Sequence, residues 1–170
     1  VEGTQLRPER QFSQAGFELI GSESHYADVE AIVLAVEGLL EVGVEEISVD
    51  LTLPLLVPIV CEDLGFDKKL SSTARNFLDR KDLVSLESIT LSGKDKILST
   101  LLKSVGPVDE ALHSLASANL SNRAKLVLDH AALVLSGVRA SLPELVLTLD
   151  PSEYRGFEYH TGLGFTIFAR

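Results

Sequence analysis

The densest group of chemically active side chains lies near the end of this 170-residue chain, in the sequence RGFEYHTGLGF at residues 155–165. It holds a guanidinium, a carboxylate, a phenol and an imidazole, from Arg155, Glu158, Tyr159 and His160. Its glycines let the backbone come close to a ligand or adopt positive φ. Such a mixture could line a pocket for a small polar molecule. Composition does not decide between that pocket and a turn into an edge strand whose charges face water.

A second polar pair lies near the N-terminus. Residues 11–20 alternate in a way that predicts a strand, which would put Gln14 and Glu18 on one face with Gly16 between them. The pair could line a notch, or it could face water on a sheet whose other face is the core. If the two ends of the chain share one face, these groups converge with Arg155 and its neighbours. A carboxylate and rings suit an imidazole or ammonium group, and a guanidinium suits a carboxylate, so an amino acid would match both.

The elements that would position these groups follow from hydrophobic periodicity and turn residues. Serines at 22 and 24 and the apolar spacing from residue 27 predict a helix that ends at Gly43. Strands are predicted at residues 45–51 and 145–150, and the chain after residue 165 continues as a strand. Between them the sequence predicts helices and no strand, with the helices at residues 54–64, 67–79, 81–91, 94–104, 107–117 and 121–141.

This order of elements predicts an α+β fold rather than alternating βαβ units. We expect an antiparallel sheet interrupted by a mostly helical insertion. The first part of the core would span residues 1–53, the helical insertion 54–143, and the return to the core 144–170.

Charge and composition exclude several classes of protein. The net charge is −10, and residues 1–61 carry eleven acidic and two basic side chains, which argues against nucleic-acid binding there. No apolar run approaches the length of a membrane span. The first residues lack the basic and apolar regions of a signal peptide, so we expect none. The single Cys61 excludes an internal disulfide and suits a reducing compartment.

Common catalytic signatures are absent from the sequence. It contains no phosphate-binding GxxxxGK[ST] loop, no dinucleotide-binding GxGxxG and no GxSxG nucleophile motif. His113 and His130 have no partner at metal-ligand spacing, so we expect both at the surface or at the edge of the core and expect no metal site. The basic residues around Lys68 and Lys81 are interrupted by aspartates and predict a solvated helix face.

Two segments resemble a known family. The sequence RQFSQAGFELIG at residues 10–21 resembles motif 2 of histidyl-tRNA synthetases, and RGFEYHTG at 155–162 resembles their histidine-specific motif. The resemblance implies a class II synthetase core, and a fragment of it, because the segments expected for motifs 1 and 3 are missing. It also assigns five side chains to a histidine-like ligand site: Gln14, Glu18, Arg155, Tyr159 and His160. His160 stands where the synthetases usually have a second tyrosine.

Within this family the sequence is more similar to the synthetase-like regulatory subunits of ATP phosphoribosyltransferase. The YHTG run at 159–162, the acidic helix after residue 22 and the short segment before residue 12 carry this similarity. It implies a cytoplasmic, non-catalytic subunit without a cofactor that acts in the first step of L-histidine biosynthesis and in its feedback inhibition. Its partner would be the catalytic phosphoribosyltransferase subunit, with a homodimer inside a hetero-oligomer, histidine as a candidate ligand, and neither nucleic acid nor membrane. The alternative is a fragment of an active synthetase that charges tRNA.

Overall fold

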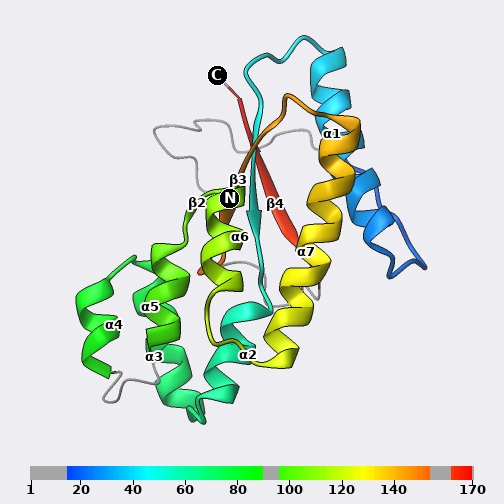
Figure 1. Ribbon diagram of the computed structural model, residues 1–170. Helices are drawn as coiled ribbons and strands as arrows, with labels where there is room; N and C mark the ends of the chain where they lie inside the picture. Colours follow the sequence, from blue (N-terminus) through cyan, green and yellow to red (C-terminus); the bar gives the residue numbers. More distant parts are fainter. Residues whose placement is uncertain (1–14, 90–95, 154–161, 170) are drawn as a thin grey trace.

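A computed structural model describes residues 15–89, 96–153 and 162–169 (Figure 1). Seven helices and four strands lie within these ranges. In chain order they are α1 (His25–Glu41), β1 (Ser48–Thr52), α2 (Leu56–Asp63), α3 (Lys68–Asp79), α4 (Leu83–Ile89), α5 (Lys96–Lys103), β2 (Gly106–Pro107), α6 (Val108–Ala116), α7 (Asn122–Ser141), β3 (Val146–Asp150) and β4 (Gly164–Phe168).

The strands form one mixed sheet in the order β2-β3-β1-β4. The central pair, β1 and β3, is parallel, with Asp50 opposite Thr148. Strand β4 runs antiparallel to β1, and the two-residue β2 runs antiparallel to β3. The parallel pair is possible because the whole helical region separates β1 from β3 in the chain, and parallel neighbours need a long crossover connection.

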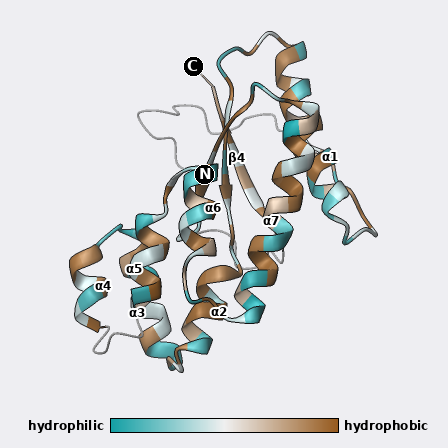
Figure 2. Cartoon of the chain, viewed as in Figure 1, coloured by the Kyte–Doolittle hydropathy of each residue, from teal (hydrophilic) through white to brown (hydrophobic). Residues whose placement is uncertain are grey.

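Alternation along the strands gives the sheet two different faces. Val49 and Leu51 of β1 and Leu147 and Leu149 of β3 are all buried and point to one side. They join buried residues of α1, α6 and α7 in one continuous hydrophobic core. The other side carries Asp50 and the polar residues of β3. Figure 2 shows hydrophobic and hydrophilic residues alternating along α6 and α7.

Helices α1 and α7 run side by side, and a glycine lets them approach closely (Figure 1). A Cβ atom placed on Gly137 of α7 would lie 2.6 Å from a methyl carbon of Val29 in α1. The helix ends have the capping residues that the sequence predicts. Ser24 accepts a hydrogen bond from the Tyr26 amide at the start of α1, and Gly43, at φ 83°, ends that helix.

The helical block between β1 and β3 matches the predicted pattern closely. Each of the six predicted segments contains one observed helix, and α3, α4 and α5 form a group at the opposite end of the molecule from α1 (Figure 1). One detail was wrong, because Gly106–Pro107 pairs with β3 as a short strand where only a turn was expected. The division of the chain into a core and an insertion remains a prediction.

Two further expectations about the sheet need correction. The α+β fold class is confirmed, but the sheet is mixed rather than wholly antiparallel, since β1 and β3 are parallel. The structure describes residues 15–20 of the strand predicted at residues 11–20, and they do not form a strand. They are exposed and pair with none of the four strands. Alternation gives a segment the ability to form a strand, but its backbone groups also need a hydrogen-bonded neighbour.

Candidate functional site

Only one of the five predicted ligand residues lies among the described ranges. Gln14, Arg155, Tyr159 and His160 are outside them, so their convergence remains a prediction. Glu18 is exposed in a segment without regular structure. The position of the segment that resembles the histidine-specific motif is nevertheless defined along the chain, because residues 154–161 lie between β3 and β4. Both strands flank β1, with Asp150 and Gly164 on either side of Thr52.

The polar face of the sheet begins at the middle of the parallel pair. The Thr148 hydroxyl donates a hydrogen bond of 2.7 Å to a carboxylate oxygen of Asp50. Both side chains are half-buried, and the register places them opposite each other. This contact ties β1 to β3 through side chains as well as through the backbone. It leaves the second oxygen of Asp50 without a hydrogen bond to any described residue.

A denser polar cluster lies at the C-terminal end of β3. The Lys81 ammonium forms an ion pair with Asp150 Oδ2 and donates to Ser152 Oγ at 2.8 Å. The hydroxyl and the backbone amide of Ser152 both donate to Asp150 Oδ1, at 2.7 and 3.0 Å. Asp150 and Ser152 are buried, whereas the Lys81 side chain is 44% exposed. Both oxygens of a buried carboxylate are therefore satisfied, as burial of a charge requires.

Two neighbouring groups make this end of the sheet electrostatically unusual. The pKa of the half-buried Glu153 is raised, first by desolvation and then by the negative charge of Asp150, while Lys81 opposes the shift. Among the described residues, the buried hydroxyl of Thr52 has no hydrogen-bond partner. A carboxyl group that keeps its proton more readily and an unsatisfied hydroxyl are both features found more often at binding sites than elsewhere.

A cleft of about 740 Å³ opens near the same end of the sheet. It is lined by Ser22, Glu23, Ser24, Asp28, Leu53, Leu55, Leu126, Val127, His130, Gly162 and Leu163. Across it, His130 of α7 lies 2.6 Å from the carboxylate of Asp28 in α1. His130 thus occupies the core-edge position expected from the sequence, and its contact links the two helices. His113 is exposed on α6, also as expected.

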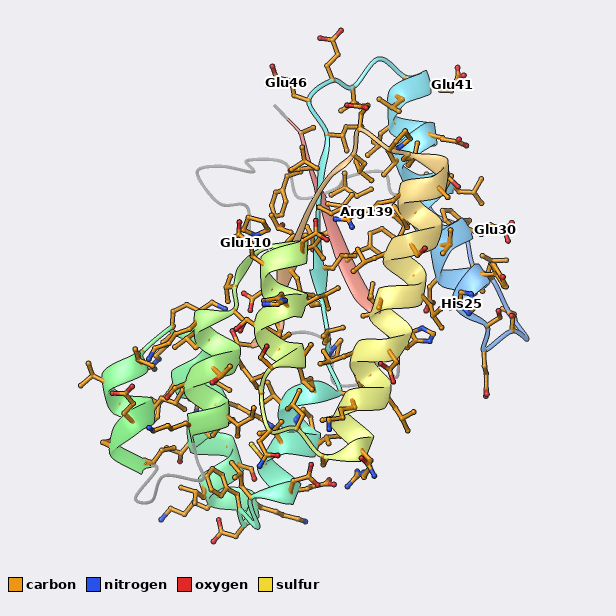
Figure 3. All side chains as sticks on the ribbon, viewed as in Figure 1. His25, Glu30, Glu41, Glu46, Glu110 and Arg139 are labelled. Atoms are coloured by element: carbon orange, nitrogen blue, oxygen red, sulfur yellow. The ribbon has the colours of Figure 1, made fainter. Side chains whose placement is uncertain are left out.

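The arrangement can hold a small polar ligand but shows no feature specific to metal binding. Within residues 15–89, 96–153 and 162–169, no three His, Cys, Asp or Glu side chains gather as metal ligands would. The same ranges contain no helix long and apolar enough to cross a bilayer. Acidic residues such as Glu30, Glu41 and Glu46 project at the periphery (Figure 3).

Sequence reasoning did not identify the cluster formed by Lys81, Asp150 and Ser152. Asp150 was predicted only as the end of the strand at 145–150, and Lys81 as part of a solvated helix face. One signal was available, since Lys81 follows α3 at a place where a helix usually ends with glycine. Its partner Asp150 lies 69 residues away in the chain, which no local pattern can reveal.

Comparison with known proteins places this chain in a family. The model of the family described as histidyl-tRNA synthetase matches residues 1–170. The chain belongs to the histidyl-tRNA synthetase family. It is 45% identical over 170 residues to the ATP phosphoribosyltransferase regulatory subunit of Paramagnetospirillum magneticum, and 42% identical over 170 residues to that of Rhodospirillum centenum. All of the chain is aligned in both cases, but it spans only 45% and 44% of these two relatives.

Solved structures of the family share the fold. An ATP phosphoribosyltransferase regulatory subunit/histidyl-tRNA synthetase from Bacillus halodurans matches with a TM-score of 0.77 at 22% identity, over 88% of this chain and 40% of that chain. The ATP phosphoribosyl transferase (HisG:HisZ) complex from Thermotoga maritima matches with a TM-score of 0.67 at 19% identity, over 86% and 52%. These likenesses confirm the class II synthetase-like fold that the two sequence motifs imply.

Proposed function

We propose that the protein to which this chain belongs is the regulatory subunit of ATP phosphoribosyltransferase. It would bind the short catalytic subunit, support the first step of L-histidine biosynthesis and transmit feedback inhibition by histidine. The observation that carries the proposal is 45% identity over all 170 residues to a regulatory subunit, with further relatives of the same name at 42% and 41%. The Thermotoga maritima neighbour is an ATP phosphoribosyl transferase (HisG:HisZ) complex, which supports the partnership.

We further propose that the protein does not catalyse aminoacylation of tRNA. One feature of the sequence supports it, which is His160 in place of the family's second tyrosine. The proposal also includes a cytoplasmic location, with which the buried, unpaired Cys61 is compatible. An active histidyl-tRNA synthetase is the second candidate, because the chain belongs to the histidyl-tRNA synthetase family and a synthetase from Nostoc shares the fold with a TM-score of 0.64.

Two assays on the full-length protein separate these candidates. The first measures charging of histidine tRNA with ATP and histidine. The second measures the phosphoribosyltransferase activity of a short catalytic subunit with and without this protein. We expect no charging and a large gain of transferase activity that histidine then inhibits. Charging at the rate of a genuine synthetase, without any effect on the transferase, would overturn the proposal.

The proposed ligand is histidine, held by Gln14, Glu18, Arg155, Tyr159 and His160. A carboxylate suits the imidazole or ammonium group, and a guanidinium suits the carboxylate of the amino acid. Feedback also requires histidine to bind one state of the complex more tightly than another. Glu18 is the described member of the set, and its exposure leaves the carboxylate accessible.

Calorimetry with histidine tests Glu18 directly. We expect Glu18→Ala to weaken binding by about tenfold or more, the scale of a lost charge-assisted hydrogen bond. Glu37→Ala is the matched control, because Glu37 is an exposed carboxylate in the middle of α1. Equal affinities for Glu18→Ala and the unchanged protein would remove Glu18 from the site.

A further inference from the structure

An apolar groove opens where the C-terminal ends of α1 and α7 lie beside the start of β3. It has a volume of about 250 Å³, and its apolar lining comes from Val36, Leu40, Ile47, Leu142, Pro143 and Leu145. Leu40 is 50% exposed. Two apolar residues that adjoin the lining in the chain, Val42 and Val146, are 76% and 59% exposed. Because exposed apolar side chains normally lie singly, their gathering around a groove marks an interaction surface.

The rim of this groove is acidic. The two segments that line it, 36–47 and 141–145, carry five exposed glutamates and no basic residue: Glu37, Glu41, Glu45, Glu46 and Glu144. Figure 3 shows Glu41 and Glu46 projecting outward at this end of the molecule. Within the described part of the chain, none of the five forms an ion pair. Arg139, two residues before the second segment, is already held by Asp109 through two hydrogen bonds. The rim therefore presents negative charge that no described cation neutralises.

Glu46 has a backbone conformation that favours glycine. Its φ angle is 50°, in the left-handed region where a Cβ atom carries a steric penalty. A glycine at this position would ease the backbone but would remove one charge from the rim. Glu46 is thus a place where the stability of the fold and the charge of the rim can be separated by one substitution.

The size and polarity of the groove limit what it can hold. Pockets that enclose a small-molecule ligand usually measure about 300–1,000 Å³, so this one suits a few side chains better than a whole ligand. Protein interfaces place apolar anchors in such pockets and surround them with a polar rim. A second copy of the chain in a symmetric contact would set one acidic rim against another, which like charges oppose. Lysine or arginine at the rim would instead be attracted.

We propose that this groove is a docking site for a basic amphipathic segment of a partner protein. An apolar side chain of the segment enters the groove beside Leu40, and its lysines or arginines face Glu41, Glu46 and Glu144. Packing in the groove supplies affinity, and the complementary charges at the rim supply orientation and speed of association. The inference goes beyond the proposed function and does not depend on which of its two candidates is correct.

The test uses the full-length protein and a fluorescent synthetic peptide of leucine and lysine, patterned as an amphipathic helix. A second peptide has glutamate in place of lysine. We expect fluorescence anisotropy to show binding of the lysine peptide only, and added salt to weaken it. Leu40→Asp should raise the dissociation constant by about tenfold or more, as loss of an anchor does. Glu46→Gly should raise it by about threefold while the melting temperature stays equal or rises.

Val84→Asp and Glu30→Gln are the matched controls, because Val84 is 80% exposed on α4 and Glu30 is exposed in the first half of α1. Both should leave the affinity unchanged. The inference is wrong if Leu40→Asp binds the lysine peptide as well as the unchanged protein does, if Glu30→Gln loses as much affinity as Glu46→Gly, or if the unchanged protein binds neither peptide. Sedimentation without peptide tests for a second copy. A different oligomeric state in Leu40→Asp would mean that another copy of the protein covers the groove, which would also overturn the inference.

Discussion

The two faces of the sheet are built from alternate residues of the same strands, yet they differ in polarity and in the contacts that hold them. Leu51 is buried against the hydrophobic core, and its neighbour Asp50 points the other way to a hydrogen bond with Thr148. In β3, Leu149 faces the core, whereas Asp150 faces the ammonium of Lys81. One face is held by non-directional packing and the other by a few directional contacts.

This difference separates stability from function. The apolar face buries large side chains, each of which contributes a substantial share of a stability that is small overall. The polar face contributes less, because each hydrogen bond replaces a bond to water. It does place carboxylates, hydroxyls and an ammonium within reach of one another. We therefore expect substitutions on the first face to unfold the protein and substitutions on the second to change what it binds.

The largest effect is expected for Leu51→Ala on the apolar face. Leu51 is 1% exposed and lies between Leu149 and Phe165 in the register, so its removal leaves a cavity. We expect the free energy of unfolding, measured by urea denaturation, to fall by about 2–5 kcal/mol. Val146→Ala is the control, because Val146 is 59% exposed on the same sheet, and we expect less than about 1 kcal/mol. Similar losses for both variants would remove the contrast between the faces.

A smaller effect is expected where helices cover the apolar face. Gly137→Ala would bring a methyl group within 2.6 Å of Val29, so the two helices must move apart. We expect a loss of about 1–3 kcal/mol by overpacking, measured by thermal or urea denaturation. Gly38→Ala in α1 meets no atom within 4 Å and should gain up to about 1 kcal/mol from helix propensity. Adding Val29→Ala to Gly137→Ala should restore most of the loss, and a failure to do so would mean that another contact is responsible.

The polar face is tested by the pair Asp50 and Thr148. Asp50→Ala removes one hydrogen bond and should cost about 0.5–1.5 kcal/mol in unfolding free energy. Because the two side chains share that bond, Thr148→Val should add less in the Asp50→Ala background than alone. Urea denaturation of the four proteins in this double-mutant cycle measures the difference. Strictly additive losses would show that the contact contributes nothing to stability.

The smallest effect is a dependence on pH at Glu153. Its pKa is raised above the ordinary 4.5, first by burial and then by Asp150, so the folded protein holds this proton more tightly than the unfolded chain. Stability from this group is therefore complete below the ordinary pKa and falls as pH rises through the higher folded value. Glu153→Gln should be more stable than the unchanged protein at pH 7 and equally stable at pH 3. The exposed Glu144→Gln serves as the control in the same denaturation series.

The local elements of the fold could be predicted, since their causes lie within a few residues. Ser24 and Gly43 mark both ends of α1 as expected, and Ser121 caps α7 at the predicted start of that helix. Strands β1 and β3 lie within one to three residues of their predicted bounds, because alternation of polar and apolar residues is itself local. The same local cause misled at residues 15–20, where an alternating segment pairs with none of the strands in the described part of the chain.

The candidate site was predictable only in part. The sequence motifs at 10–21 and 155–162 indicated the family, which the comparisons confirm. They did not indicate Asp50, Thr148 or Lys81, whose roles depend on contacts 69 or more residues apart. Lys81 illustrates the difficulty, because its charge in a helix-end sequence is typical of a solvated surface.

By itself the sequence determined the helices, most of the strands, the family and the acidic character of the chain. Helical periodicity, capping residues and strand alternation express interactions between near neighbours, so a reader of the chain can recover them. Only the tertiary structure decided that β1 and β3 are parallel, and which polar residues share the open face of the sheet. It also decided that Lys81 is strained at φ 55° in order to reach Asp150. Such pairings depend on how distant segments meet, and that is fixed by burial of the whole core rather than by any one segment.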